Sequence, residues 1–340
     1  MKKPPTDPAA SAPTATGASE LALRLSSVLW GPLLMHNAER AARLLRHAPG
    51  VRPEDQGVAV TSGLRYGAEP WQRYDIYRPA DVTGPLPLAL YVHGGGFQFF
   101  DRATHWPIAT EIARHGYVVA QIDYRLAPKH RYPAAVLDAA AAYVHLAAHA
   151  RDLGADPSRF VMAGESAGAN LVLGLAIARC WRRPEPHARA VWDAEMHPSV
   201  LLPACGYLQI SEPERHERLR PVSAIIGARI HTVSNAYLPD HATERPDHAF
   251  ASPLLMLERA GPPERPFPAT MAIVGGGDPV QDDTLRLGPA LTRLRVPHEV
   301  RVTPGRGHAF HALTFQADAR DAWKAQMAFV ARVLAADPAS

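Results

Sequence analysis

Features that would place the chain in a specialised class of protein are scarce. Its 340 residues include only two cysteines, Cys180 and Cys205, which are too few for a disulfide framework and lack the spacing of a metal site or a redox pair. We expect both to be reduced and partly buried. The 36 basic residues nearly balance the 33 acidic ones, leaving a net charge of +3, and they are scattered along the chain. This balance predicts no nucleic-acid partner.

Long apolar runs are also absent. The longest, Leu171 to Ala178, has eight residues, whereas a helix that crosses a bilayer needs about 20. The first residues are rich in proline and lack the apolar core of a secretory signal. We therefore expect residues 1–18 to be a disordered leader, the protein to be cytoplasmic, and no part of it to insert into a membrane.

The composition that remains, 47% hydrophobic and 20% charged, is that of a soluble globular protein. Short apolar runs bounded by turn residues predict eight strands, and helical periodicity predicts helices between and after the later ones. Strands that alternate with helices form mostly parallel sheets with helices on both faces. The sequence therefore predicts an α/β fold with an eight-stranded sheet. The predicted strands are 58–60, 74–77, 86–92, 117–122, 160–163, 200–202, 271–274 and 300–302, and the predicted helices are 105–115, 134–150, 167–182, 285–295 and 319–335.

Two stretches stand outside this alternation. Before the first strand, apolar residues at helical spacing from Leu21 to Leu45 predict two amphipathic helices broken near Gly31 and Pro32. Residues 205–250 are rich in Arg, His, Glu and Pro and show no convincing strand. Because open α/β sheets bind ligands at the carboxyl ends of their strands, an insertion at that edge is well placed to act as a lid. A plain surface loop is the alternative.

One serine follows a predicted strand directly. Gly164-Glu165-Ser166-Ala167-Gly168 ends that strand and opens an apolar helix, which is the setting of a nucleophile elbow. The flanking glycines permit a strained turn, and the helix start offers backbone N–H groups beside the serine oxygen. Without a preceding strand and a following helix, the Gly-x-Ser-x-Gly pattern is weak evidence, because it also occurs by chance. We predict Ser166 as a nucleophile and a structural role for Glu165.

A glycine loop, His93-Gly94-Gly95-Gly96, ends another predicted strand. It is not a phosphate cradle of the usual kind, because no Gly-Lys-Ser/Thr follows and the dinucleotide glycine spacing is missing. Bare backbone N–H groups at such a place can stabilise a developing oxyanion. We predict Gly94, Gly95 and Gly96, together with Ala167, as the donors of an oxyanion hole. A merely flexible turn is the alternative.

A serine nucleophile needs a base, and the base needs an acid that orients it. His308 lies in a glycine-bounded loop just after the last predicted strand, and Asp278 lies in the corresponding loop one strand earlier. The chain order Ser166, Asp278, His308 is the order of an α/β-hydrolase triad. Asp282 and Asp283 are rivals for the acid, but their place in the first turn of the next helix predicts a capping role.

These motifs together resemble the hormone-sensitive lipase-like family of α/β-hydrolase carboxylesterases, the bacterial family IV esterases. The resemblance covers roughly residues 55–335, and we interpret its Tyr-Arg-Leu-Ala-Pro stretch as a support for the glycine loop. It implies the triad Ser166, Asp278 and His308, no metal and no cofactor, and a cap built from residues 19–55 and 205–250 over a catalytic domain of 56–204 and 251–340. The motifs that carry the resemblance are His93 to Gly96, Asp123 to His130 with Tyr132 to Ala135, Gly164 to Gly168, Ser252 to Leu254, Asp278 to Asp283, and Gly305 to His308.

The predicted function is hydrolysis of small short- to medium-chain acyl esters by a serine carboxylesterase, acting as a monomer or homodimer. Phe97, Phe99, Phe100 and Trp30 are the predicted pocket residues. The sequence departs from the family pattern at three places. Glu165 replaces the commoner Asp, and Ala309 replaces a frequent Gly after the histidine. The segment that follows the glycine loop, residues 97–100, lacks the further glycine that is usual there. Alternatives on the same scaffold are an amidase or deacetylase, a dehydratase, and a ligand receptor without catalysis.

Overall fold

The structure, a computed structural model, describes residues 33–239 and 246–336. The predicted leader at 1–18, the first of the two predicted N-terminal helices and Trp30 lie outside the described residues. The second predicted N-terminal helix is present at 33–45.

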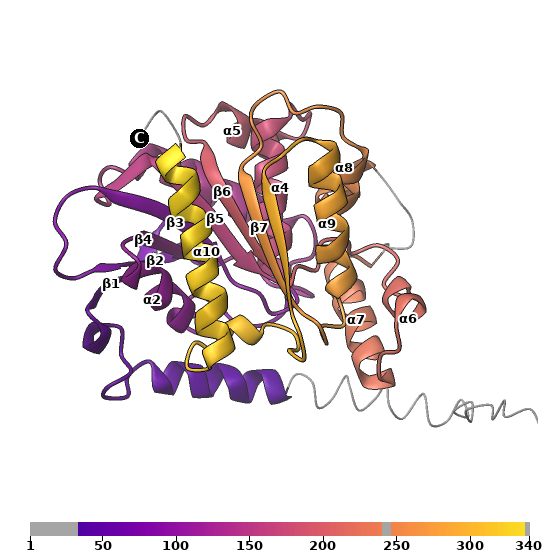
Figure 1. Ribbon diagram of the computed structural model, residues 1–340, viewed down its shortest axis with the longest axis horizontal. Helices are drawn as coiled ribbons and strands as arrows, with labels where there is room; N and C mark the ends of the chain where they lie inside the picture. The colour runs from indigo at the N-terminus through magenta and orange to yellow at the C-terminus, as the bar shows by residue number, and fades with distance from the viewer. Residues whose placement is uncertain (1–32, 240–245, 337–340) are drawn as a thin grey trace, which may run out of the picture.

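The centre of the protein is one eight-stranded sheet in the order β1-β2-β4-β3-β5-β6-β7-β8 (Figure 1). Strands β1 and β2 run antiparallel to their neighbours, and the other pairs are parallel. The inner strands are continuous apolar runs because helices bury both of their faces. All eight predicted strands are confirmed. They are β1 (Val58–Arg65), β2 (Arg73–Pro79), β3 (Leu86–Val92), β4 (Val118–Ile122), β5 (Ala155–Glu165), β6 (Pro198–Ala204), β7 (Ala269–Gly275) and β8 (His298–Thr303).

Helices cover both faces of the sheet, as predicted. Helices α2 (Trp106–Arg114) and α10 (Ala317–Ala336) lie on one face, where Trp106 and Trp323 belong to the same apolar cluster. Helices α3 (Ala134–His149), α4 (Ala167–Cys180) and α9 (Gln281–Arg293) lie on the other. Figure 1 shows α10 in front of the strands and α4 behind them. Two short helices were not predicted, α5 (Pro186–Asp193) and α8 (Pro253–Arg259).

The segment 205–250 contains no strand among its described residues, in agreement with its sequence. It forms α6 (Arg215–Leu219), α7 (Ala224–Tyr237) and the 3-10 helix η2 (Pro246–Ala251). In Figure 1, α6, α7 and the helix at 33–45 lie along the lower side of the molecule. No helix among the described residues combines the length and the hydropathy needed to cross a bilayer.

Two of these outer elements contact the loop that follows β3. The ring of Tyr237, the last residue of α7, stacks on Phe97 with centroids 3.7 Å apart. Glu39, in the helix at 33–45, accepts a hydrogen bond of 2.6 Å from the Phe100 N–H. The glycine loop at the carboxyl end of β3 is therefore held between the sheet and both outer elements.

Candidate active site

Ser166 occupies a strained turn between β5 and α4. Its backbone has φ 53° and ψ −114°, which is unusual for a residue with a side chain. The turn is tight because a Cβ on Gly168 would collide with the carbonyl oxygen of Val92, and a Cβ on Gly164 would lie 2.7 Å from the Gly168 backbone. Only glycine fits at these two positions, so the geometry is that of the predicted elbow.

The structure brings the three predicted triad residues together. Ser166 Oγ lies 3.0 Å from His308 Nε2, and His308 Nδ1 lies 2.9 Å from Asp278 Oδ2. Asp278 is fully buried, and its other oxygen accepts a 2.9 Å hydrogen bond from the Val280 N–H. Hydroxyl, imidazole and carboxylate thus form one hydrogen-bonded chain, which is the arrangement that activates a serine.

The ionisation of His308 is set by its neighbour. Desolvation of the ring lowers its pKa, but attraction to the Asp278 carboxylate and the hydrogen bond with it outweigh that effect and hold the pKa above its usual value. The side chain remains 37% exposed, so solvent has access to the ring. A base with a somewhat raised pKa is well suited to taking a serine proton near neutral pH.

The glycine loop has fewer free donors than its sequence predicts. The Gly94 N–H donates to Glu165 Oε1 at 2.5 Å, so Gly94 is already engaged. No hydrogen bond to another part of the described chain is found for the N–H groups of Gly95, Gly96 or Ala167. Gly95 and Gly96 have φ of 107° and 61°, a conformation that glycine adopts without cost. Of the four predicted oxyanion donors, these three therefore have N–H groups without a partner in the described chain, and their role in an oxyanion hole stays a prediction.

Glu165 belongs to a buried polar cluster beneath the loop. Besides Gly94, it accepts a short hydrogen bond from the Tyr91 hydroxyl, and its Oε1 lies 2.8 Å from His105 Nε2. Burial raises the pKa of Glu165 to about 8 and lowers that of His105 well below its usual value. Both shifts favour the uncharged form of the pair. The predicted structural role of Glu165 is confirmed, whereas Tyr91 and His105 carried no sequence signal.

The Tyr-Arg-Leu-Ala-Pro stretch supports the loop, as predicted. The Tyr124 hydroxyl donates to the carbonyl oxygen of His93 at 2.9 Å, and its ring stacks on the His93 ring with centroids 4.4 Å apart. The Ala127 N–H donates to the Phe97 carbonyl at 2.7 Å. These contacts fix both ends of the glycine loop.

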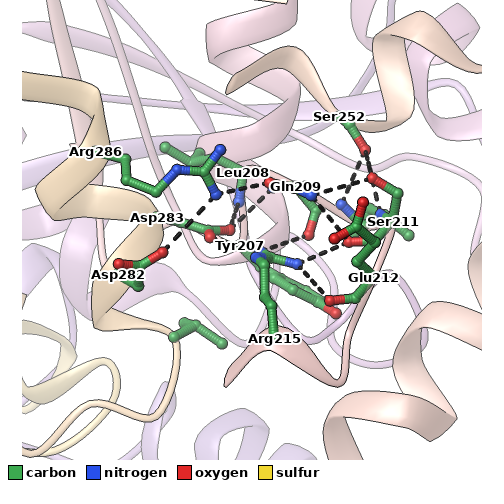
Figure 2. A network of polar contacts seen from close by, with 12 residues as sticks. Tyr207, Leu208, Gln209, Ser211, Glu212, Arg215, Ser252, Asp282, Asp283 and Arg286 are labelled. Carbon is green, nitrogen blue, oxygen red and sulfur yellow. Dashed lines mark hydrogen bonds and ion pairs between the residues drawn. The ribbon is translucent and has the colours of Figure 1, made fainter. Parts of the chain in front are cut away.

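A second polar network ties the chain after β6 to α9 (Figure 2). The buried Asp283 carboxylate accepts hydrogen bonds from the N–H groups of Leu208 and Gln209, at 2.8 and 2.9 Å, and from Arg215 at 2.5 Å. The prediction that Asp283 caps its own helix is therefore wrong, because its side chain points away from the helix start and toward this segment. Arg220, further along the insertion, donates to the carbonyl oxygen of Asp278 at 2.8 Å. The insertion thus positions the loop that carries the predicted acid.

The predicted pocket phenylalanines pack into the structure around the loop. Phe97 is fully buried against Tyr237, and the Arg229 guanidinium lies 5.0 Å from the ring centroid of Phe99. The Phe100 ring meets His105 edge-on at 5.2 Å. Their contact with a substrate stays a prediction, as does that of Trp30.

Cys205 is a neighbour of the triad that the sequence did not predict. Its sulfur, a carboxylate oxygen of Asp278 and a ring nitrogen of His308 lie within 4.8 Å of one another. Both cysteines are free and buried, more deeply than predicted. Burial raises the pKa of the Cys205 thiol well above its usual value, so it is not a competing nucleophile. No sequence spacing could have revealed this cluster, because its members are far apart in the chain.

A strained serine hydrogen-bonded to a histidine that rests on a buried aspartate, at the carboxyl ends of a mostly parallel sheet, defines the α/β-hydrolase class. The profile of the family described as alpha/beta hydrolase fold matches residues 89–312. The chain therefore belongs to this family, and the predicted resemblance to its hormone-sensitive lipase-like group is confirmed.

Individual relatives give the same picture. Esterase LipI of Mycobacterium tuberculosis is 34% identical over 220 residues, which cover 63% of this chain and 62% of the relative. Carboxylesterase NlhH of the same species is 37% identical over 131 residues, covering 38% of this chain and 41% of the relative. The matched stretches thus span less than two thirds of either relative.

Solved structures match over more of their length. Esterase LipW of Mycobacterium marinum is 26% identical, with a TM-score of 0.67 over 94% of this chain and 91% of that one. Esterase B of Lactobacillus rhamnosis, at 18% identity and a TM-score of 0.73 over 93% of this chain and 96% of that one, shows the same fold.

Proposed function

We propose that the protein is a serine carboxylesterase that hydrolyses small esters with short- to medium-chain acyl groups. The observation that carries the proposal is the hydrogen-bonded chain from the Ser166 hydroxyl through His308 to the buried Asp278 carboxylate, at 3.0 and 2.9 Å. The relatives named esterase and carboxylesterase support the same reaction class.

In the proposed cycle, Ser166 attacks the ester carbonyl while His308 takes the hydroxyl proton at Nε2 and Asp278 holds the tautomer with the proton on Nδ1. The oxyanion accepts hydrogen bonds from the Ala167 N–H and from Gly95 or Gly96. His308 then protonates the leaving alcohol. A water molecule, deprotonated by the same imidazole, cleaves the acyl-enzyme, and the acid leaves with Ser166 restored.

The elements around the loop support a covered pocket. We assign residues 33–55 and 205–250 to a cap over the catalytic body, because α7 lies directly against the glycine loop. A Cβ on Gly96 would lie 2.9 Å from Val233 of that helix. This close approach of α7 to the glycine loop supports short acyl chains, since a long chain that passed between them would have to displace α7.

The replacement of Ser166 by Ala tests the reaction. Without the nucleophile, kcat for a short nitrophenyl ester should fall by about 10⁶-fold, to the background of the assay. The matched control is Ser158→Ala, an exposed serine bonded only to Asp156, which should retain full activity. Undiminished turnover by Ser166→Ala would overturn the proposal.

A substrate series tests the specificity. Nitrophenyl esters of increasing acyl length should show kcat/KM highest for short or medium chains, and a maximum at long chains would contradict the proposed pocket. Nitroanilides of the same acids separate the amidase alternative, which requires amide turnover above ester turnover. Binding of the esters without any turnover would favour the receptor alternative.

A further inference from the structure

Cys205 lies against the acid and the base of the triad. It is the first residue after β6 and is only 1% exposed. Its Sγ, a ring nitrogen of His308 and a carboxylate oxygen of Asp278 all lie within 4.8 Å of one another. Sulfur, nitrogen and oxygen thus form one cluster of potential metal ligands beside the serine.

The chain holds this cysteine firmly. Its backbone N–H donates to the Ile273 carbonyl of β7 at 2.7 Å, and its φ of 39° is one that few residues other than glycine adopt. The Ala309 N–H approaches the thiol, and the Ser166 N–H next to it donates to the carbonyl oxygen of Ala204, the residue before Cys205, at 2.9 Å. The sulfur is therefore fixed by the same strand ends and loops that position the triad.

We propose that Cys205, Asp278 and His308 form an inhibitory site for a thiophilic divalent cation of the Zn²⁺ and Cd²⁺ class. A thiolate, an imidazole and a carboxylate are the ligands that Zn²⁺ prefers, and three of them with one open position make a stable tetrahedral site. The consequence for activity rests on the proposed function, because it requires His308 to be the catalytic base.

The geometry requires small shifts only. Tetrahedral Zn²⁺ with ordinary bond lengths places its ligand atoms about 3.4–3.6 Å apart. Because the three atoms lie within 4.8 Å of one another, the sulfur has to approach the other two ligands by about 1.3 Å at most. Where Nδ1 is the nitrogen ligand, its 2.9 Å contact with Asp278 also has to open by about half an ångström. The His308 side chain is 37% exposed, which gives solvent ions access to the cluster from that side.

Binding blocks the base. The Cys205 thiol releases its proton to solvent and becomes the thiolate ligand. A cation on Nδ1 leaves the single proton of the neutral imidazole on Nε2, and a cation on Nε2 takes that lone pair itself. In both cases Nε2 cannot accept the proton of Ser166. One proton is released for each cation bound, and no atom is oxidised or reduced.

The second cysteine provides a matched control. Cys180 ends α4, about 20 Å along the helix from Ser166, and its thiol donates to the Pro266 carbonyl at 3.4 Å. It is as deeply buried as Cys205 but belongs to no ligand cluster among the described residues. Cys180→Ser therefore removes a buried thiol and leaves the proposed site complete.

Inhibition of ester hydrolysis by Zn²⁺ gives the first test, with each variant compared with its own metal-free rate. The wild-type protein and Cys180→Ser should be inhibited at the same Zn²⁺ concentration. In Cys205→Ser, the half-inhibitory concentration should rise by at least about tenfold. Mg²⁺, which prefers oxygen ligands, should not inhibit over the same range. Equal inhibition of Cys205→Ser and wild type would overturn the site.

Direct titration with Cd²⁺ gives a second readout that does not depend on turnover. The ultraviolet charge-transfer band of a Cd²⁺–thiolate bond should saturate at one equivalent in the wild-type protein and in Cys180→Ser. It should be lost in Cys205→Ser. Absence of this band from an active wild-type protein would overturn the site, even if Cys205→Ser does not fold. A normal band on a protein without esterase activity would instead refute the proposed function and leave the cation site standing.

Discussion

Two carboxyl–histidine pairs flank Ser166, and they differ in charge. On one side Asp278 lies 2.9 Å from His308, and on the other Glu165 lies 2.8 Å from His105. The pKa of His308 is raised by its carboxylate, whereas burial lowers the pKa of His105 and raises that of Glu165 to about 8. These shifts favour the charged form in the first pair and the uncharged form in the second.

Desolvation lowers the pKa of both histidines, but the charge of Asp278 compensates it in His308, whereas the nearby His93 and His311 lower the pKa of His105 further. The two pairs also differ in solvent access. His308 keeps 37% of its side chain exposed, while His105 keeps 13% and lies beneath the glycine loop. Burying a charged group is costly unless other groups compensate it, and a buried carboxyl group without enough compensation takes up a proton instead. The open pair can exchange protons with a substrate, and the closed pair serves as a neutral brace for Gly94.

Asp278→Asn breaks the charged pair and should have the largest effect. An amide in place of the carboxylate leaves His308 in the wrong tautomer, so kcat should fall by about 10⁴-fold. The measurement is ester turnover at saturating substrate. Asp282→Asn removes a carboxylate four residues along the chain, in α9, that does not contact the histidine, and it should remain within a few fold of wild type. A similar loss in both variants would contradict the assignment of Asp278.

The acid limb of the pH–rate profile sharpens the same assignment. Because the pKa of His308 is raised, wild-type kcat/KM should fall as the pH drops through a value above 6.5, where the imidazole becomes protonated. In Asp278→Asn the cause of the raised pKa is gone, so the residual activity should persist to lower pH. An unchanged acid limb would show that another group controls it.

Glu165 variants break the neutral pair and should have an intermediate effect. Glu165→Ala leaves the Gly94 N–H and the Tyr91 hydroxyl without their acceptor, and a displaced oxyanion loop costs up to about 10²-fold in kcat. Glu165→Gln keeps an acceptor oxygen and the same volume without charge, so it should stay within about tenfold of wild type. If Glu165→Gln lost as much activity as Glu165→Ala, the Glu165–His105 pair would have to be ionised. The contrast with the Asp278–His308 pair would then be wrong.

The pH dependence of stability tests the Glu165–His105 pair without reference to turnover. Folded Glu165 keeps its proton up to a pKa of about 8, while the unfolded chain releases it near 4.5. Between these values the native state binds more protons, so this group makes the free energy of unfolding fall as pH rises, by at most about 1.4 kcal/mol per pH unit. Urea titrations across this range should show the slope in wild type and lose its Glu165 part in Glu165→Gln. Identical slopes would mean that Glu165 is already ionised.

The sequence was most informative where function depends on local chain geometry. The elbow around Ser166 could be predicted because a strained turn needs glycine at fixed neighbouring positions. The inner strands could be placed because buried strands are uninterrupted apolar runs, whereas the partly exposed edge strands β1 and β8 showed only short apolar stretches. The short helices α5 and α8 were missed because eight and seven residues give too few turns for a clear period.

Contacts made through space were not predictable in the same way. His105 is one of 17 histidines, and nothing in its neighbourhood in the chain points to Glu165. Asp283 was expected to cap a helix because its position is typical of a cap, whereas its actual partners lie 68 to 75 residues earlier in the chain. Cys205 reaches the triad only because β6, β7 and β8 end side by side.

The distance in sequence between Ser166 and His308, 142 residues, bears on the order in which the protein becomes active during synthesis. The nucleophile and the glycine loop are made in the first half of the chain, and the acid and the base come near its end. A chain whose translation stops before residue 308 therefore carries the strained serine without its base. If ester hydrolysis is followed during translation, its first appearance marks the point at which β8 and the loop that carries His308 have been made. Enzyme turnover can therefore report when the sheet is complete.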